Sequence, residues 1–203
     1  MLSALRKTLA GICLLTAVAI APSVASAAEG ALDTFRTSHT KVSSLLASRA
    51  DTSALQTEVD NLLDYHALAV ESLGGAAQFP KRCEPRCDEL ETLLARLIRE
   101  NYLRRLRSDK DHKVTFVGEE KRPRGVRVQT TVEYVKEGRP VVVEVDYLMH
   151  EVDGRWQVRD IITDGVSLAR NYKYEFNQIL KQDGIDGLIA RLESKLALVA
   201  KKD

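Results

Sequence analysis

The chain has 203 residues, of which 30 are basic and 29 acidic, so its formal net charge is +1 at pH 7. A balance this even excludes the strong basic excess of a typical nucleic-acid-binding domain. Hydrophobic residues make up 44% of the chain, which is enough to bury a sizeable core in one domain.

Residues 1–27 have the three parts of a secretory signal peptide: two basic residues near the start, an apolar run, and small residues at Ala25–Ala27. The apolar run is shorter than the ~20 residues that a helix needs to span a bilayer. We therefore expect cleavage after Ala27, export as a soluble protein, and a single domain over residues 28–203. An uncleaved membrane anchor is the alternative.

Apolar residues at three- and four-residue spacing predict three helices in the first half of the chain. Ser53 and Gln56 match a capping box at the start of the second helix, Gly74-Gly75 closes it, and Asp88 is placed to cap the third. The three apolar stripes are Phe35, Val42, Leu45 and Leu46; Val59, Leu62, Leu63, His66 and Val70; and Leu90, Leu93, Leu94, Leu97 and Ile98.

Two cysteines, Cys83 and Cys87, lie in the segment RCEPRC before the third helix. In an exported protein, cysteines this close usually pair, so we expect a structural disulfide. Free thiols, a metal site or redox use are the alternatives. No histidine stands nearby, and the spacing is not the C-x-x-C of redox enzymes.

From Lys113 the hydrophobic period changes from 3.6 to 2, which predicts half-buried strands. Gly138 and Asp153-Gly154 mark hairpin turns between them. Short turns between consecutive strands make an antiparallel meander. The alternating residues are Val114 and Phe116; Val126, Val128, Thr130, Val132 and Tyr134; Val141, Val143, Val145, Tyr147 and Met149; and Trp156, Val158 and Ile162.

Two further amphipathic helices follow the last strand, and Asp183 is placed to cap the second of them. Because each apolar face must be buried, we expect an α+β fold in which a curved antiparallel sheet is wrapped by about five helices. The two apolar stripes are Ala169, Tyr172, Phe176, Ile179 and Leu180; and Ile185, Leu188, Ile189, Leu192 and Leu196.

The chain lacks the common catalytic motifs: it has no G-x-S-x-G, no P-loop, no H-E-x-x-H and no glycine-rich dinucleotide turn. Asp164 follows the last strand, where a carboxylate is expected to cap the next helix. An enzyme alternative stays open, in which Asp164 and Tyr147 transfer protons inside a cone-shaped α+β pocket.

A concentration of basic residues occurs near the end of the third predicted helix, interleaved with acids. The usual meaning of such a pattern is a solvated helix face. The alternative is a docking surface for anionic headgroups or for an acidic partner, which would make the protein a non-catalytic interaction module. The basic residues are Arg96, Arg99, Arg104, Arg105, Arg107 and Lys110.

The segment 155–195 carries the most specific pattern in the chain. It resembles the end of the MlaC, or toluene-tolerance, family of phospholipid shuttles in the Mla lipid-transport system. Residues 59–75 also resemble an early helix of that family, whereas the RCEPRC segment departs from it. The residues that carry the resemblance are Trp156, Val158, Asp160, Ile161, Gly165, Val166, Ser167, Leu168, Asn171, Tyr172, Phe176, Asn177, Ile179, Leu180, Gly187, Leu188, Ile189 and Leu192.

The resemblance implies a cystatin-like fold, akin to nuclear transport factors, and a soluble periplasmic carrier rather than an enzyme. Such a carrier holds glycerophospholipid as cargo, uses no cofactor, and maintains outer-membrane lipid asymmetry. Its implied partners are an outer-membrane lipoprotein–porin complex and an inner-membrane ABC transporter complex with a membrane-anchored lipid-binding subunit. The pocket is expected between the sheet and the helices, lined by Leu62, Tyr65, Leu94, Ile98, Val132, Val145, Tyr147, Val166, Tyr172 and Phe176.

Overall fold

The computed structural model describes residues 30–108 and 112–200, so the predicted signal peptide and Lys110 lie outside the described residues. The predicted α+β class is confirmed. In chain order, the elements are α1 (Ala31–Ala47), α2 (Thr52–Leu62), α3 (Tyr65–Ser72), α4 (Phe79–Cys83), α5 (Cys87–Ser108), β1 (Lys113–Arg122), β2 (Gly125–Lys136), β3 (Arg139–Val152), β4 (Arg155–Thr163), β5 (Val166–Ser167) and α6 (Leu168–Ala200).

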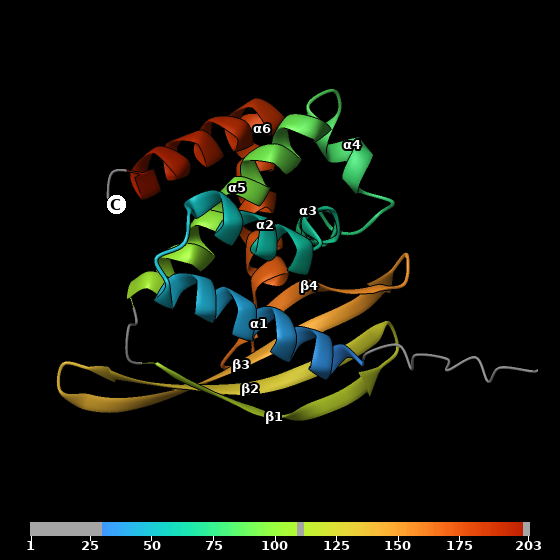
Figure 1. Cartoon of the computed structure of the whole chain (residues 1–203). Coiled ribbons are helices and arrows are strands. Elements are labelled where there is room, and N and C mark those ends of the chain that lie inside the picture. Colours follow the sequence, from blue (N-terminus) through green and yellow to red (C-terminus); the bar gives the residue numbers. More distant parts are fainter. Residues whose placement is uncertain (1–29, 109–111, 201–203) are drawn as a thin grey trace, which may run out of the picture.

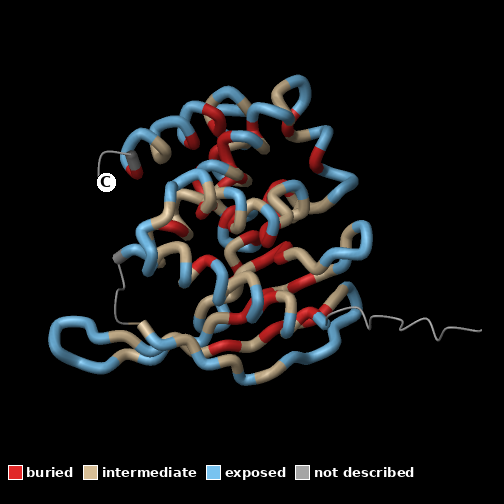
Figure 2. The backbone as a smooth tube through the Cα atoms, viewed as in Figure 1, coloured by how far each residue is buried: buried red, intermediate tan, exposed pale blue. Residues whose placement is uncertain are grey.

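The five strands form one antiparallel meander in the order β1-β2-β3-β4-β5. The helices cover one face of this sheet, with α1 lying directly over the strands and α5 and α6 stacked above it (Figure 1). The tip of the β2–β3 hairpin extends beyond the helices and is exposed (Figure 2). The hydrophobic core therefore lies between the central strands and the helices.

The predicted alternation is confirmed along β2. Val126, Val128 and Thr130 are buried, while the residues between them are only half-buried. Their partners on β3 are Met149, Tyr147 and Val145, which places all six side chains on the helix-covered face.

The second predicted helix is wrong as a single element, because it breaks at Leu63. Leu63 has extended backbone angles (φ −99°, ψ 132°) and forms a parallel β-bridge with Val158. The Asp64 N–H donates to the Val158 carbonyl at 2.9 Å, and the Asp64 side chain accepts from Ala67 N at 2.8 Å to cap α3. The break thus connects the segment between α2 and α3 to β4 by backbone hydrogen bonding.

The predicted capping box is also replaced by another cap. Asp51 caps α2, because its carboxylate accepts from Ser53 N at 3.3 Å. The amide of Gln56 instead donates to Glu100 of α5 at 3.2 Å.

Asp164 is not the cap of the following helix. Asp164 and Gly165 have φ values of +47° and +79° and form a two-residue turn from β4 to β5. The Asp164 carboxylate accepts from Glu144 N at 3.0 Å. Ser167 is the residue that caps α6, since its Oγ accepts from Arg170 N at 3.0 Å while donating to the buried carboxylate of Asp160.

The two predicted C-terminal helices are the two arms of α6, which is kinked at Gly184 (φ 65°, ψ −164°). Upstream, the short helix α4 was not predicted. It ends at Cys83, whose sulfur forms a disulfide with Cys87 at the start of α5. The disulfide therefore links two consecutive helices.

Candidate lipid-binding interior

The predicted lining residues gather in the core between the sheet and the helices. Tyr147 comes from the sheet, whereas Tyr172 and Phe176 come from the first arm of α6. Phe176 is 1% exposed and Tyr147 is 8% exposed. Six of the ten predicted residues are buried there: Leu62, Leu94, Ile98, Tyr147, Tyr172 and Phe176.

The other four lie nearer the surface. Val166 is 62% exposed, because it follows the turn that leads out of β4, so it does not line a buried interior. Tyr65, Val132 and Val145 are half-buried. The Tyr65 hydroxyl donates to Asp60 at 2.8 Å, which holds this ring at the edge of the core.

Phe35 of α1 belongs to the same interior but was not among the predicted lining residues. It is fully buried, and its ring centroid lies 4.0 Å from that of Tyr147 and 6.2 Å from that of Phe116. On α6, the rings of Tyr172 and Phe176 stack at 5.2 Å. The signal for Phe35 was present in the apolar stripe of the first helix, which needs an apolar partner on the sheet.

The tyrosine hydroxyls of this interior are neutral. Burial raises the pKa of Tyr102 to about 12, and burial, followed by the charge of Glu175, raises the pKa of Tyr172 to about 12. Burial also raises the pKa of Tyr147 far above its ordinary value. The Tyr102 hydroxyl oxygen is buried without a hydrogen-bond partner among the described residues. The interior thus combines an apolar wall with an unused hydrogen-bond donor.

The interior is closed in this structure. Phe35, Met149 and Phe176 are each at most 1% exposed, so their side chains are packed on all sides. Two hollows on the described surface are well formed, and neither lies between the sheet and the helices. One, of about 310 Å³, is beside the α1–α2 connection and includes Leu46, Leu55 and Arg107. Buried side chains such as Phe35, Tyr147 and Phe176 occupy the region that the sequence predicts for lipid, so cargo in that region must displace some of them.

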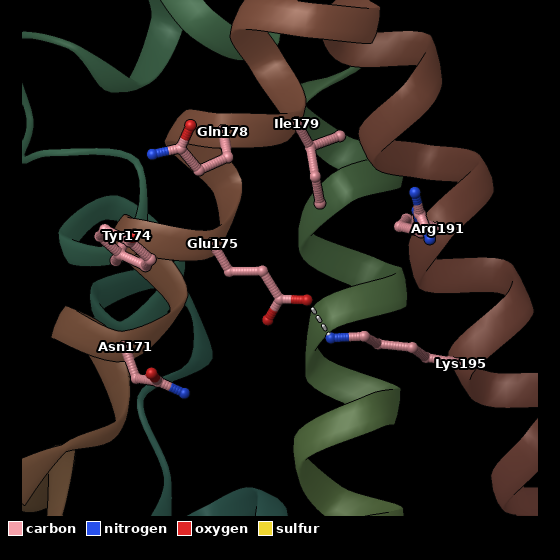
Figure 3. A pocket seen from close by; sticks show the side chains of 7 residues that line it. All are labelled: Asn171, Tyr174, Glu175, Gln178, Ile179, Arg191 and Lys195. Carbon is pink, nitrogen blue, oxygen red and sulfur yellow. Dashed lines mark hydrogen bonds and ion pairs between the residues drawn. The ribbon is translucent and has the colours of Figure 1, made fainter.

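The larger hollow, of about 430 Å³, is a groove between the two arms of α6, which we call the α6 groove. Glu175 on the first arm accepts a hydrogen bond from Lys195 on the second across this groove (Figure 3). Tyr174 at its rim is 71% exposed. The residues that line it are Asn171, Tyr174, Glu175, Gln178, Ile179, Arg191 and Lys195.

The residues of the enzyme alternative are not brought together. Asp164 is exposed and bonded to the backbone of Glu144, whereas Tyr147 is buried in the core. Two histidines pair with single carboxylates: His150 with Asp64 at 2.8 Å and His66 with Glu91 at 3.0 Å. Within residues 30–108 and 112–200, no group of three potential ligands could hold a metal ion.

The basic residues of α5 are partly engaged inside the protein. Arg99 donates to Asp60 at 2.7 Å and Arg104 to Asn101 at 2.7 Å. Arg99 therefore joins α5 to α2 instead of belonging to a fully solvated face.

The sequence model of the MlaC protein family matches residues 30–194. The chain belongs to the MlaC family. Its fold is also that of a solved phospholipid-binding protein from Ralstonia solanacearum in complex with a phospholipid. The two chains superpose with a TM-score of 0.70 at 20% sequence identity, over 85% of this chain and 99% of that one. This MlaC-family protein has, among its described helices, none long and apolar enough to cross a membrane.

Proposed function

We propose that this MlaC-family protein is a periplasmic phospholipid carrier that acts by binding and not by catalysis. The acyl tails occupy the interior between the sheet and the helices. The observation that carries the proposal is the family match together with a core of aromatic rings contributed by α1, the sheet and α6. A phospholipid bound to the Ralstonia protein of the same fold supports it.

The energetic need for such a carrier follows from the hydrophobic effect. Each methylene that leaves an apolar environment for water costs about 0.8 kcal/mol, so two acyl chains with about 30 methylenes cost roughly 25 kcal/mol. An interior of Phe, Tyr, Leu and Ile side chains resembles the bilayer closely enough for lipid transfer to be nearly balanced. The direction of net transfer then comes from partner complexes that bind or hydrolyse nucleotide.

Loading requires the closed interior to open. The rings of Phe35 and Tyr147 meet at 4.0 Å in its centre, so a lipid tail between α1 and the sheet must separate them. Because an empty apolar cavity loses the van der Waals contacts of its walls, the unloaded protein gains stability by closing over the same space. The closed and loaded forms are therefore two packings of one set of residues.

The family assignment supports the cellular setting that we propose. A signal peptide over residues 1–27 delivers a single carrier domain, residues 28–203, to the periplasm. There it receives glycerophospholipid from an outer-membrane lipoprotein–porin complex. It delivers the lipid to the membrane-anchored subunit of an inner-membrane ABC transporter, and this traffic maintains outer-membrane lipid asymmetry.

Mass spectrometry of the protein purified from the bacterial envelope without added lipid tests the proposal. The expected result is a co-purified glycerophospholipid that detergent extraction removes and vesicles restore. As a matched pair, Phe176→Ala should change the amount of bound lipid, whereas Tyr174→Ala, two positions away on the exposed side of α6, should not. A protein preparation that contains no lipid and takes up none from vesicles would contradict the carrier proposal.

A further inference from the structure

An irregularity in β4 buries Arg159, whereas regular alternation along the strand would expose this side chain. The register between β3 and β4 shifts between Leu148, which pairs with Asp160, and Met149, which pairs with Val158. Arg159 is therefore the extra residue of a β-bulge, and three consecutive residues of β4, 158–160, are buried. Bulges of this kind re-aim side chains and often lie beside functional sites.

The guanidinium of Arg159 is poorly satisfied for a group that is only 8% exposed. Its Nε is buried without a hydrogen-bond partner among the described residues. Its one ion-pair contact is Nη1 to Glu71 Oε1 at 3.6 Å, which is too long for a good hydrogen bond. A buried charge of this kind normally has several close partners, so the Nε–H of Arg159 is a donor available for a further acceptor.

A second arginine shares the same acceptor. Arg124, in the turn between β1 and β2, places its Nη1 3.1 Å from the same Oε1 of Glu71 at the end of α3. One oxygen of Glu71 thus faces two guanidinium groups, while the other nearby carboxylate, Asp160, accepts hydrogen bonds from Ser167 and Ala169. Burial, followed by the charge of Arg124, holds the pKa of Arg159 below its ordinary value, although the charges of Glu71 and Asp160 act in the opposite direction.

The surroundings add positive charge. Gly74 follows Glu71 by three residues, and a Cβ built on it would lie 3.6 Å from Arg82 Nη1 and 3.7 Å from Lys173 Cε. Arg82 itself donates to Asn177. The end of α3, which lies beside β4 (Figure 1), therefore has two further cationic side chains nearby.

We propose that Arg159 and Arg124 form a binding site for one phosphate-type oxyanion, whose place Glu71 occupies in the closed structure. A phosphate offers several acceptor oxygens where Glu71 offers one shared oxygen to both arginines, so it satisfies the two guanidinium groups together. The phosphate is supplied by a phospholipid headgroup or by free phosphate. The headgroup source rests on the proposed carrier function, whereas free phosphate binding does not.

The test is a titration with inorganic phosphate at constant ionic strength, followed through the backbone amide NMR resonances of α3 and β4, which every variant retains. Glu71→Gln removes the competing carboxylate charge and should bind phosphate about tenfold more tightly than the wild type, a change of about 1.4 kcal/mol. Adding Arg159→Met to Glu71→Gln should abolish the gain. Because the prediction is a gain of binding, a misfolded variant cannot produce it.

The matched control is Glu120→Gln. Glu120 pairs with Arg122 at 2.7 Å near the same β1–β2 turn, but this pair is exposed and shares no buried arginine. Its phosphate binding should equal that of the wild type. If Glu71→Gln binds phosphate no more tightly than Glu120→Gln, the oxyanion site is overturned.

A second experiment identifies whether the bound phosphate belongs to a lipid headgroup or is free phosphate. Native mass spectrometry compares loading with a phospholipid and with the diacylglycerol of the same acyl chains. If the lipid phosphate is the occupant, Glu71→Gln raises the preference for phospholipid and Arg159→Met removes it. If both lipids load equally in all variants while inorganic phosphate still responds, the carrier function stands and free phosphate is the occupant. Failure of loading with either lipid contradicts the carrier proposal but not the phosphate titration.

Discussion

The interior and the α6 groove differ in how tightly they are packed. The interior is lined by apolar and aromatic side chains such as Phe35 and Phe176, and it is closed. The α6 groove is lined partly by charged residues, including Arg191 and Lys195, and about 430 Å³ of it is open. Water hydrates the charged side chains along this groove, whereas the apolar side chains of the interior are more stable when they pack against each other.

Open volume is therefore a poor guide to the lipid site that we propose between the sheet and the helices. The α6 groove is open but carries charged side chains such as Arg191 and Lys195. The largest gathering of buried aromatic and aliphatic side chains lies instead in the interior. Five substitutions and one labelling experiment test this comparison, beginning with the largest expected effect.

Phe176→Ala should destabilise the lipid-free protein by about 3–5 kcal/mol, because it leaves a cavity in a closed, fully packed core. The measurement is urea unfolding of the delipidated protein. Tyr174→Ala, at the rim of the α6 groove, should stay within about 0.5 kcal/mol of the wild type. Equal losses for both variants would mean that the interior is no better packed than the groove.

Two tyrosine hydroxyls allow a finer test of the interior. Tyr65→Phe removes the hydrogen bond to Asp60 and should cost about 1–2 kcal/mol. Tyr102→Phe removes a buried hydroxyl that has no partner among the described residues, so it should leave the lipid-free protein as stable or about 1 kcal/mol more stable. Unfolding curves of the two variants would contradict this account if Tyr102→Phe proved the more damaging.

The smallest effect is expected in the α6 groove. Glu175→Gln weakens the partly exposed pair with Lys195, and such pairs contribute about 0–1 kcal/mol. The thermal midpoint and the amount of co-purified lipid should both remain close to wild-type values. A strong loss of bound lipid in this variant would move the cargo site from the interior to the groove.

The sequence predicted the parts of this fold that depend on local periodicity. The change of period at Lys113 located the meander, and the stripes of α5 and α6 identified residues that are buried. The break at Leu63 was missed because its cause is a bridge to Val158, far away in the chain, and the helical stripe continues across it.

The two Asp-Gly pairs show a second limit of prediction from local sequence. Asp153-Gly154 was correctly assigned to a hairpin, but the same dipeptide at Asp164-Gly165 was interpreted as the start of a helix. The strand that follows the second pair has only two residues, too few to show an alternating pattern. Phe35 was missed as a lining residue because its partner Tyr147 lies on the sheet, and no local pattern records that contact.

Photo-crosslinking tests the central claim most directly. The wild-type protein is loaded with a phospholipid that carries a diazirine near the end of an acyl chain, irradiated, digested and sequenced by mass spectrometry. The account predicts crosslinks to β2, β3 and the Tyr172 and Phe176 side of α6, together with Phe35. Crosslinks confined to Tyr174, Gln178 and Arg191 would place the acyl chain in the α6 groove and contradict it.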